Sequence, residues 1–404
     1  MLVGREDELR RLIVMVSSSG SHPTIEGDNG VGKTSLVAIA GYRALERFRS
    51  GNLQSLIMPL RKPFQLEEHS TAEDLERAVL FEVAHAFTEH DGFLKEHGYS
   101  APDTGAVNKW INAPTFRSGG GGAFGFSAEG GSEPNTSAGF EEAGFRNAVL
   151  RWLQECFPSR QAGGFLAILD NLELLQTSQR AKHLLEAARD GVLSLPGIRW
   201  VLSGAKGIVN SAAASQRLQG VLASPLQVKP IPDNIVGQVV ARRVDEFKIR
   251  HDAYAPVDQA GFNHIYRVMN ANLRNALNAA EQFAIWTVLE DSQPLQSGER
   301  LQLLEVWLAD QAEQHAKATS GLGRRAWEVF DHLIELGGSC SPSDYGVFRF
   351  ASQQAMRPHI KDLEDAELVD SFIDETDQRR RTIHVTSRGW LVNYHRSGYS
   401  RTAR

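Results

Sequence analysis

The sequence contains very little cysteine and no long hydrophobic run. Cys156 and Cys340 are its two cysteines, and their wide separation offers neither a zinc-ligand pattern nor a disulfide framework. No run of apolar residues approaches the length of about 18 that a membrane-spanning helix needs. These absences exclude a disulfide-stapled scaffold and a helical membrane protein, and they predict that both thiols are buried.

Positive charge is also scarce. The chain has 43 Lys and Arg against 49 Asp and Glu, which gives a formal net charge of -6. Any binding to nucleic acid must therefore depend on a local basic patch. Residues 1–6 lack the charged and then apolar pattern of a secretion leader, so we expect a cytoplasmic protein with no membrane contact.

Strand and helix patterns alternate through the first half of the chain. The apolar runs Phe165–Leu169 and Ile198–Leu202 are typical of parallel strands that are buried on both faces. Further strands are predicted at 24–26 and 55–60, and helices at 5–16, 33–48, 72–90 and 140–157. This alternation predicts an α/β fold, in which helices cover both faces of a parallel sheet.

The segment Gly27–Thr34 matches the phosphate-binding pattern G-x-x-x-x-G-K-[ST] at every position. Its glycines let backbone N–H groups wrap a phosphate chain at the positive end of the following helix. We therefore predict an ATP site, with Lys33 on the outer phosphates and the Thr34 hydroxyl on Mg²⁺. The residues expected to contact the nucleotide are Gly27, Asp28, Asn29, Gly30, Val31, Gly32, Lys33, Thr34 and Ser35. The alternative is a glycine-rich turn before an ordinary helix.

A P-loop needs acidic partners to complete the metal shell and to orient water. Asp170 ends the apolar run Phe165–Leu169, and ligands bind at the carboxyl ends of parallel strands. Asp170 is therefore the predicted Mg²⁺ partner. Asn171 follows it, and the next carboxylate, Glu173, is the candidate base for water, unless it is only a solvent-facing residue at a helix start.

Together these motifs resemble the AAA+ ATPases, in the branch of origin-recognition and initiator ATPases and the related STAND-type signalling ATPases. The likeness spans about residues 2–316. It includes Val3–Leu9, which is similar to the N-terminal box of that branch, and Asn270–Leu277, which is similar to the start of its second-sensor helix. One departure is that Asp170-Asn171 replaces the usual acidic pair, which makes hydrolysis less certain than binding.

The resemblance implies roles for further residues. Adenine contacts fall to Val3, Gly4 and Arg5, and the first polar sensor falls to Ser203 at the end of Ile198–Leu202. Arg274 corresponds to the arginine that reaches the γ-phosphate from the lid. Arg217 corresponds to the arginine finger given to a neighbouring subunit, which implies a homo-oligomer. The ordinary alternatives are a strand-end serine for Ser203, a surface arginine paired with a carboxylate for Arg274 and a solvated arginine for Arg217.

The sequence predicts three domains. Residues 1–230 form the P-loop domain, residues 231–318 an all-helical lid with helices at 235–247, 256–268, 272–289 and 299–316, and residues 322–400 a third domain. Within the first domain, nine of the 36 glycines fall between Ser118 and Gly144. This predicts an insertion that is a hairpin, a loop or a disordered spacer.

The third domain has the pattern of a C-terminal winged helix. Helices are predicted at 326–334, from Ser341, at 352–366 and at 387–394, with a β-hairpin between 368 and 385. The segment from Asp362 to Gly389 is similar to winged-helix transcription regulators, whose third helix enters the major groove. Double-stranded DNA is therefore a candidate partner, and the contacts implied are Ser352, Gln353, Gln354, Arg357 and Lys361 on the third helix and Arg379, Arg380 and Arg381 on the wing.

Two functions remain open from the sequence. The first is a Mg²⁺-dependent ATPase that couples its nucleotide state to DNA or to a DNA-bound partner. The second is a STAND-type switch in bacterial defence or signalling, which holds nucleotide and recruits an effector chain with little turnover. Residues 321–404 contain 12 basic and 12 acidic residues, so the third domain can equally be a protein-docking module.

Overall fold

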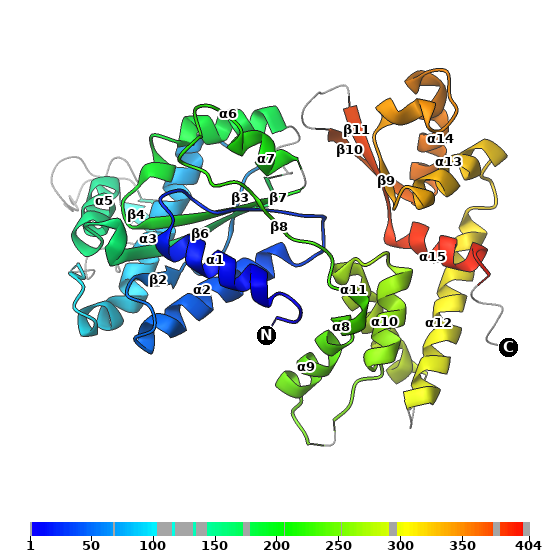
Figure 1. Ribbon diagram of the computed structural model, residues 1–404, viewed down its shortest axis with the longest axis horizontal. Coiled ribbons are helices and arrows are strands. Elements are labelled where there is room, and N and C mark those ends of the chain that lie inside the picture. Colours follow the sequence, from blue (N-terminus) through cyan, green and yellow to red (C-terminus); the bar gives the residue numbers. More distant parts are fainter. Residues whose placement is uncertain are drawn as a thin grey trace. The chain divides into compact units, whose positions relative to one another are not determined.

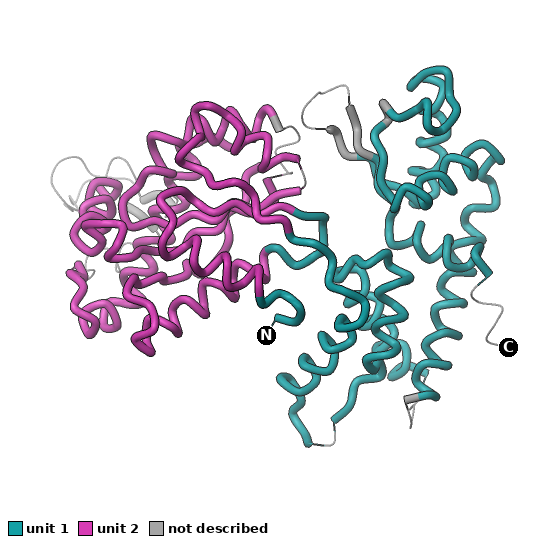
Figure 2. Tube along the Cα trace, viewed as in Figure 1, with its two compact units in different colours: residues 1–6, 27–33, 228–404 teal, residues 7–26, 34–227 magenta. Residues whose placement is uncertain are grey.

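The computed structural model describes residues 2–67, 69–102, 115–117, 132–134, 144–172, 178–205, 207–251, 253–290, 297–374 and 380–398. The chain forms two compact units (Figure 2). The sheet unit contains Asp7–Glu26 and Thr34–Gln227, and the helical unit contains Met1–Glu6, Gly27–Lys33 and Val228–Arg404. Most of the predicted glycine-rich insertion, residues 118–131 and 135–143, lies outside the described residues.

The sheet unit is built on a parallel sheet with the strand order β2–β6–β7–β1–β8, and β3 also pairs with β6 (Figure 1). All of its strand pairs are parallel. The strands are β1 (Thr24–Glu26), β2 (Leu56–Pro59), β3 (Phe64–Gln65), β6 (Gly163–Asp170), β7 (Ile198–Gly204) and β8 (Leu226–Gln227). A separate antiparallel pair, β4 (Thr115–Arg117) and β5 (Ser132–Pro134), flanks the glycine-rich segment.

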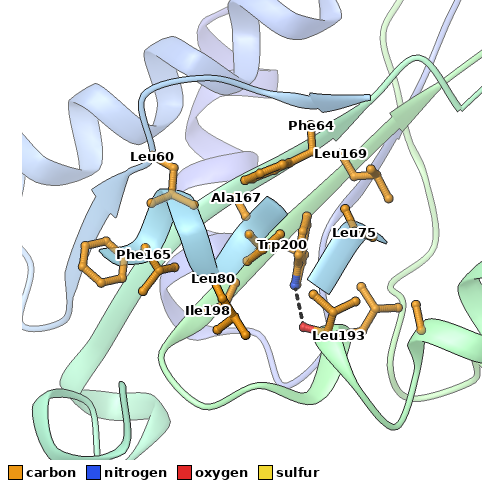
Figure 3. Packing of buried hydrophobic residues seen from close by; sticks show 14 of the residues in the cluster. Leu60, Phe64, Leu75, Leu80, Phe165, Ala167, Leu169, Leu193, Ile198 and Trp200 are labelled. Carbon is orange, nitrogen blue, oxygen red and sulfur yellow. Dashed lines mark hydrogen bonds between the residues drawn. The ribbon is translucent and has the colours of Figure 1, made fainter. Parts of the chain in front are cut away.

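Helices cover both faces of this sheet, as the α/β prediction requires (Figure 1). Alternate residues of β6 and β7, including Phe165 and Trp200, enter a large apolar core (Figure 3). On the opposite face, Gly41 of α2 lies close against Leu166. The helices are α1 (Glu6–Ser18), α2 (Lys33–Arg49), α3 (Ala72–Glu96), α5 (Phe145–Cys156), α6 (Ser178–Ala188) and α7 (Ile208–Ala213), with 3₁₀ turns η2 (Arg160–Ala162) and η4 (Val192–Ser194).

The helical unit starts with five helices after β8. They are α8 (Asp233–Val236), α9 (Gln238–Phe247), α10 (Gln259–Val268), α11 (Leu273–Leu289) and α12 (Ser297–Ala318). The predicted helix 235–247 is thus divided at Gly237, whose backbone stays right-handed (φ −59°, ψ −26°). Gly237 packs closely on α10, since an added Cβ would lie 2.7 Å from the Gln259 carbonyl oxygen. These helices share one apolar core, in which Tyr266 and Phe283 are fully buried.

The last part of the helical unit has the elements of a winged helix. They are α13 (Arg324–Glu335), β9 (Ser339–Cys340), η5 (Pro342–Gly346), α14 (Gln353–Asp365), β10 (Val369–Asp374), β11 (Arg380–Val385) and α15 (Ser387–Arg396). The helix predicted from Ser341 is only the 3₁₀ turn η5, and β9 adds a third strand that was not predicted. Helix α14 continues through Pro358 in its second turn, where the missing N–H removes one helical hydrogen bond, that to the Gln354 carbonyl oxygen.

Two sequence expectations about burial and membranes can be compared with this structure. Both cysteines are buried and free, and burial raises the pKa of Cys156 and of Cys340 to about 12. Among the described residues, none of the helices combines the length and the apolar character that crossing a membrane requires.

A buried histidine joins the sheet to its flanking loop. His22 is 5% exposed, its Nε2 lies 2.8 Å from the carbonyl oxygen of Leu193, and its Nδ1 accepts from the backbone N–H of Trp200 at 3.3 Å. These partners assign the neutral ring with its proton on Nε2. Burial, together with the nearby positive charges of Arg160 and Arg199, lowers the pKa of His22 to about 4.

This lowered pKa predicts an acid-sensitive fold. The pKa of His22 is about 4 in the folded chain and 6.5 for the ordinary side chain, so the unfolded chain binds the extra proton first. We expect the free energy of unfolding to fall by up to about 3 kcal/mol between pH 6.5 and 4 through this residue. Urea unfolding of wild type and His22→Gln across that range measures the difference, and equal pH slopes for the two proteins would contradict it.

Candidate phosphate site

The P-loop carbonyl oxygens are held by donors of the helical unit. Lys33 Nζ donates to the carbonyl oxygens of Gly27 and Asp28 at 2.9 and 3.2 Å. The next three oxygens, those of residues 29, 30 and 31, accept from Asn272 Nδ2 at 3.0 Å, the Arg274 N–H at 3.2 Å and Arg5 Nη2 at 3.0 Å. Because a trans peptide directs its N–H opposite to its carbonyl, the N–H groups that follow these three oxygens face away from the donors, as an anion site requires. One of them, the Val31 N–H, makes a long bond of 3.5 Å to the Asp28 carbonyl oxygen.

Gly30 occupies a variable position of the loop pattern, but its surroundings in this structure require glycine. Its φ is +81°, and a Cβ there would lie 2.3 Å from Asn272 Oδ1. Neither the left-handed backbone nor the close approach of α11 leaves room for a side chain. The backbone of the P-loop at Gly30 therefore packs directly against the side chain of Asn272 at the start of α11.

The N-terminal residues lie beside the same loop. Arg5 is 3% exposed and Val3 is 7% exposed, and Arg5 reaches the carbonyl oxygen of Val31. Gly4 has φ +63°, and a Cβ there would meet Ile235 Cδ1 at 2.4 Å. The structure thus brings the box Val3–Arg5 to the P-loop and to α8, with Arg5 holding the loop itself.

In the sheet unit, the carboxyl ends of β6 and β7 carry the other predicted polar residues. Thr34 Oγ1, in the first turn of α2, donates to Asp170 Oδ2 at 2.5 Å. Ser203 lies on the neighbouring strand β7, where Leu202 pairs with Leu169, the residue before Asp170. Asp170 Oδ1 and Ser203 Oγ are buried and have no hydrogen-bond partner among the described residues.

The residue after Asp170 ends the strand. Asn171 has φ +56°, a left-handed conformation that Asn tolerates better than most residues. The carboxylate predicted as the water-activating base, Glu173, lies outside the described residues, as do residues 174–177. Asn171 therefore turns the chain away at the position where the usual acidic pair has its second carboxylate.

The two predicted arginines have different surroundings. Arg274 is exposed in the first turn of α11, and within the described part of the chain no carboxylate is paired with its guanidinium. Arg217 follows α7 in the sheet unit, has a side chain that is 64% exposed, and lies 4.0 Å from Glu186. The finger and sensor roles of these two residues stay predictions.

The predicted DNA-contacting residues of α14 differ in exposure, because one face of this helix is buried. Met356, Ile360 and Leu363 of this helix are buried. Gln354, Arg357 and Lys361 are exposed, and Gln353 is half-buried.

The remaining predicted contacts lie at the helix start and on the wing. Ser352 caps α14 by accepting from the Ala355 N–H at 3.2 Å, which occupies its hydroxyl. Arg379 lies outside the described residues, and Arg380 and Arg381 lie on β11 opposite Asp374 and Ile373. These DNA contacts also stay predictions.

Some residues of the site were missed from the sequence. Glu26, 3% exposed, accepts from the N–H groups of Gly207 and Asn210 at 2.8 and 2.9 Å and from Gln227 Nε2 at 2.9 Å, so it caps α7. Asn272, whose contact with the P-loop is described above, also caps α11. An Asn directly before an apolar helical pattern is an N-cap signal that could have identified it.

The residues present fit a magnesium nucleotide. Within the described ranges, no group of three or more His, Cys, Asp or Glu side chains is arranged to hold a metal ion. A P-loop Mg²⁺ does not need such a group, since one hydroxyl, one carboxylate and the phosphates supply its protein-side and nucleotide oxygens. Thr34 and Asp170 are a pair of this kind, and the unpartnered Asp170 Oδ1 leaves one oxygen available.

The chain is similar to several solved structures, at low identity. The Aeropyrum pernix ORC1 protein in complex with DNA has 15% identity and a TM-score of 0.46, and the match covers 100% of this chain and 94% of that one. The ORC2 protein of Aeropyrum pernix, in ADPNP–ADP complexes, has 12% identity, coverage of 98% and 95%, and a TM-score of 0.45. A Walker-type ATPase of Pyrococcus abyssi has 16% identity, coverage of 96% and 95%, and a TM-score of 0.45.

No protein-family model and no curated protein matches the sequence. At the identities and TM-scores above, these similarities say nothing about activity, which must be inferred from the residues themselves.

The unpartnered hydroxyl of Ser203 predicts a separation of stability from activity. Removing a buried hydroxyl that has no partner among the described residues should leave the free energy of unfolding unchanged or raise it by up to about 1 kcal/mol. If the hydroxyl serves a bound nucleotide, Ser203→Ala should lower ATP turnover at least about tenfold. Chemical denaturation and a steady-state ATPase assay measure the two effects.

Thr24→Val is the matched control in the same sheet. Thr24 Oγ1 donates to the carbonyl oxygen of Ala223 at 2.8 Å, so this isosteric change should lower the free energy of unfolding by about 1 kcal/mol. A large loss of stability in Ser203→Ala would show instead that its hydroxyl has a structural partner.

Proposed function

We propose that the protein is a Mg²⁺-dependent ATPase that couples its nucleotide state to the binding of double-stranded DNA or of a DNA-bound protein. Its three domains would be the P-loop domain, residues 1–230, the lid, 231–318, and the winged helix, 322–400. The arrangement of the P-loop supports the nucleotide part of the proposal, and the exposed residues of α14 support the DNA part.

The main support for the proposal is the set of hydrogen bonds around Gly27–Thr34. Three consecutive loop carbonyl oxygens have external donors, Lys33 is bound back onto the start of the loop, and Thr34 is bonded to Asp170. A loop held by its carbonyl oxygens presents N–H groups to an anion, and Lys33 adds a positive charge. With Mg²⁺ bound, the metal would supply electrostatic stabilisation of the transferred phosphoryl group.

Each candidate residue has a distinct role in this proposal. Thr34 and Asp170 would hold the metal, and Ser203 would hydrogen-bond a phosphate oxygen or the attacking water. Glu173 is the proposed base that accepts the water proton. Arg274 and, from a neighbouring copy, Arg217 would neutralise charge that develops on the γ-phosphate.

One observation favours the alternative, a nucleotide switch with little turnover that recruits an effector chain. Asn171 occupies the position after Asp170, and an amide cannot accept a proton from water as a carboxylate does. Steady-state ATPase activity with and without double-stranded DNA discriminates the two functions. Stimulation by DNA supports the coupled ATPase, and retained nucleotide with negligible turnover supports the switch.

Loss of the P-loop lysine should weaken nucleotide binding. Lys33→Ala removes the one ammonium group of the loop, and we expect ATP affinity to fall more than about tenfold, which is about 1.4 kcal/mol. Isothermal titration with a non-hydrolysable ATP analogue and Mg²⁺ measures this. Lys95→Ala, at an exposed position of α3, is the control and should bind as wild type does. Equal affinity in Lys33→Ala would remove the basis of the proposed function.

DNA binding through the wing should show in the salt dependence. Arginine contacts with phosphates release counterions, so replacing Arg379, Arg380 and Arg381 by Ala should flatten the slope of log affinity against log salt by up to about 3 units. Fluorescence anisotropy with duplexes of several sequences measures the slope.

The control for this variant removes three exposed arginines of the sheet unit, Arg43, Arg47 and Arg151, and should leave the slope unchanged. Absence of DNA binding at low salt, with and without ATP, would identify the winged helix as a protein-docking module.

A further inference from the structure

The turn between α10 and α11, residues 270–272, is bonded to two other parts of the helical unit. Asn270 Nδ2 donates to the carbonyl oxygen of Gly337 at 3.0 Å, in the segment between α13 and β9 of the winged helix. Asn272 Nδ2 donates to the carbonyl oxygen of Asn29 in the P-loop, also at 3.0 Å. One residue, Ala271, separates the two side chains.

The backbone of this turn is closely specified. Asn270 closes α10 in a left-handed conformation, φ +50°, with its N–H bonded to the Arg267 carbonyl and the Ala271 N–H bonded to the Tyr266 carbonyl. This is the hydrogen-bond pattern of a Schellman helix end, where Asn is accepted in place of Gly. Ala271 is also left-handed, φ +59°, which is unfavourable for alanine and persists only where neighbouring bonds hold it.

The P-loop end of the turn depends on the shape of the loop. Asn272 accepts from the Asn275 N–H at 3.1 Å while it donates to Asn29, and the Arg274 N–H donates to the Gly30 carbonyl. The P-loop carbonyls thus satisfy donors at the start of α11, including one backbone N–H that has no partner inside the helix. A phosphate that orients the loop N–H groups also orients these carbonyls, because each peptide unit is rigid.

The winged-helix end of the turn is equally connected. Gly337 precedes Gly338, whose carbonyl oxygen accepts from the Val385 N–H at the end of β11 at 2.8 Å. A side chain at Gly338 would lie 2.4 Å from Trp390 of α15. A shift of Gly337 would therefore displace groups that contact both β11 and α15. Helix α15 itself is attached to the lid core by its buried residues Leu391 and Tyr394.

We propose that Asn270 and Asn272 are positioning residues that transmit occupancy of the P-loop to the winged helix through the backbone of residues 270–272. The inference deepens the proposed function and rests on it, since it requires a nucleotide at the P-loop. A bound nucleotide strengthens the two bonds to the start of α11, the turn becomes more rigid, and the Asn270–Gly337 bond holds the winged helix in one position. An empty loop loosens the same series of bonds.

Hydrogen–deuterium exchange of the full-length protein tests this chain of contacts. The samples are the protein alone and the protein with saturating Mg²⁺ and a non-hydrolysable ATP analogue, after a binding titration. In wild type, the nucleotide should slow exchange of peptides that cover 337–340 and 383–386 by at least about threefold. Asn270→Gly keeps the left-handed backbone and removes the donor. It should bind nucleotide within about twofold of wild type and lose the slowing.

Two further variants make the result specific. Asn270→Asp keeps the side-chain shape but replaces the donor with an acceptor that faces a carbonyl oxygen, so it should lose the slowing as Asn270→Gly does. Asn278→Ala, on an exposed position of α11, should retain both binding and slowing. A purely structural role of Asn270 would change exchange equally with and without nucleotide, and would leave the difference between the two states intact.

The possible failures are distinguishable. If wild type binds the analogue and exchange of 337–340 does not change, or if it still slows in both Asn270 variants, the transmission through Asn270 is overturned while the proposed function stands. If wild type does not bind the analogue, the titration overturns the proposed function, and the inference falls with it.

Discussion

A loop that offers its N–H groups to a phosphate has to direct its carbonyl oxygens the other way, and those oxygens need donors. In this protein the donors come from three separate places in the helical unit: the N-terminal Arg5, the loop's own Lys33, and the start of α11 with Asn272 and Arg274. The P-loop is thereby hydrogen-bonded to both Arg5 and the start of α11, two segments that are far apart in the sequence. The same constraint explains why a left-handed glycine, Gly30, stands opposite Asn272.

The parts of the fold that follow from local patterns were predictable from the sequence. Strands β6 and β7 are continuous apolar runs, and α13 and α14 have apolar residues at helical spacing. Each pattern reflects how one element is buried, so it can be recognised within that element's own sequence. The closeness of Thr34 and Asp170 was also predictable, because one belongs to a fixed motif and the other ends a strand whose direction is visible in the sequence. Their metal role stays a prediction. Helix boundaries differ from the predicted ones by a few residues, for example at Gly237, which packs closely against Gln259 of α10.

The parts that were not predicted depend on contacts between distant segments. The strand β9 has only two residues, Ser339 and Cys340, and exists because it pairs with β11 about 40 residues later. Glu26 reads as an ordinary strand residue, and its role as the cap of α7 needs the register of β1 against β7. The bonds of Asn270 and Asn272 likewise join segments that are far apart in the chain, and no periodicity signals them.

The buried polar side chains at the carboxyl edge of the sheet differ in whether the described residues supply them with hydrogen-bond partners. Glu26, on β1, has three donors within the protein, so this edge can satisfy a buried carboxylate where the role is structural. Asp170 and Ser203, on the neighbouring strands β6 and β7, each retain a buried oxygen with no partner among the described residues. Leaving such a group unsatisfied costs about 1–3 kcal/mol. Within the residues that the structure describes, Glu26 is satisfied and these two oxygens are not, a difference that a bound ligand would explain. Asp170 also accepts the hydrogen bond of Thr34, the residue at which the sequence motif predicts a metal ion.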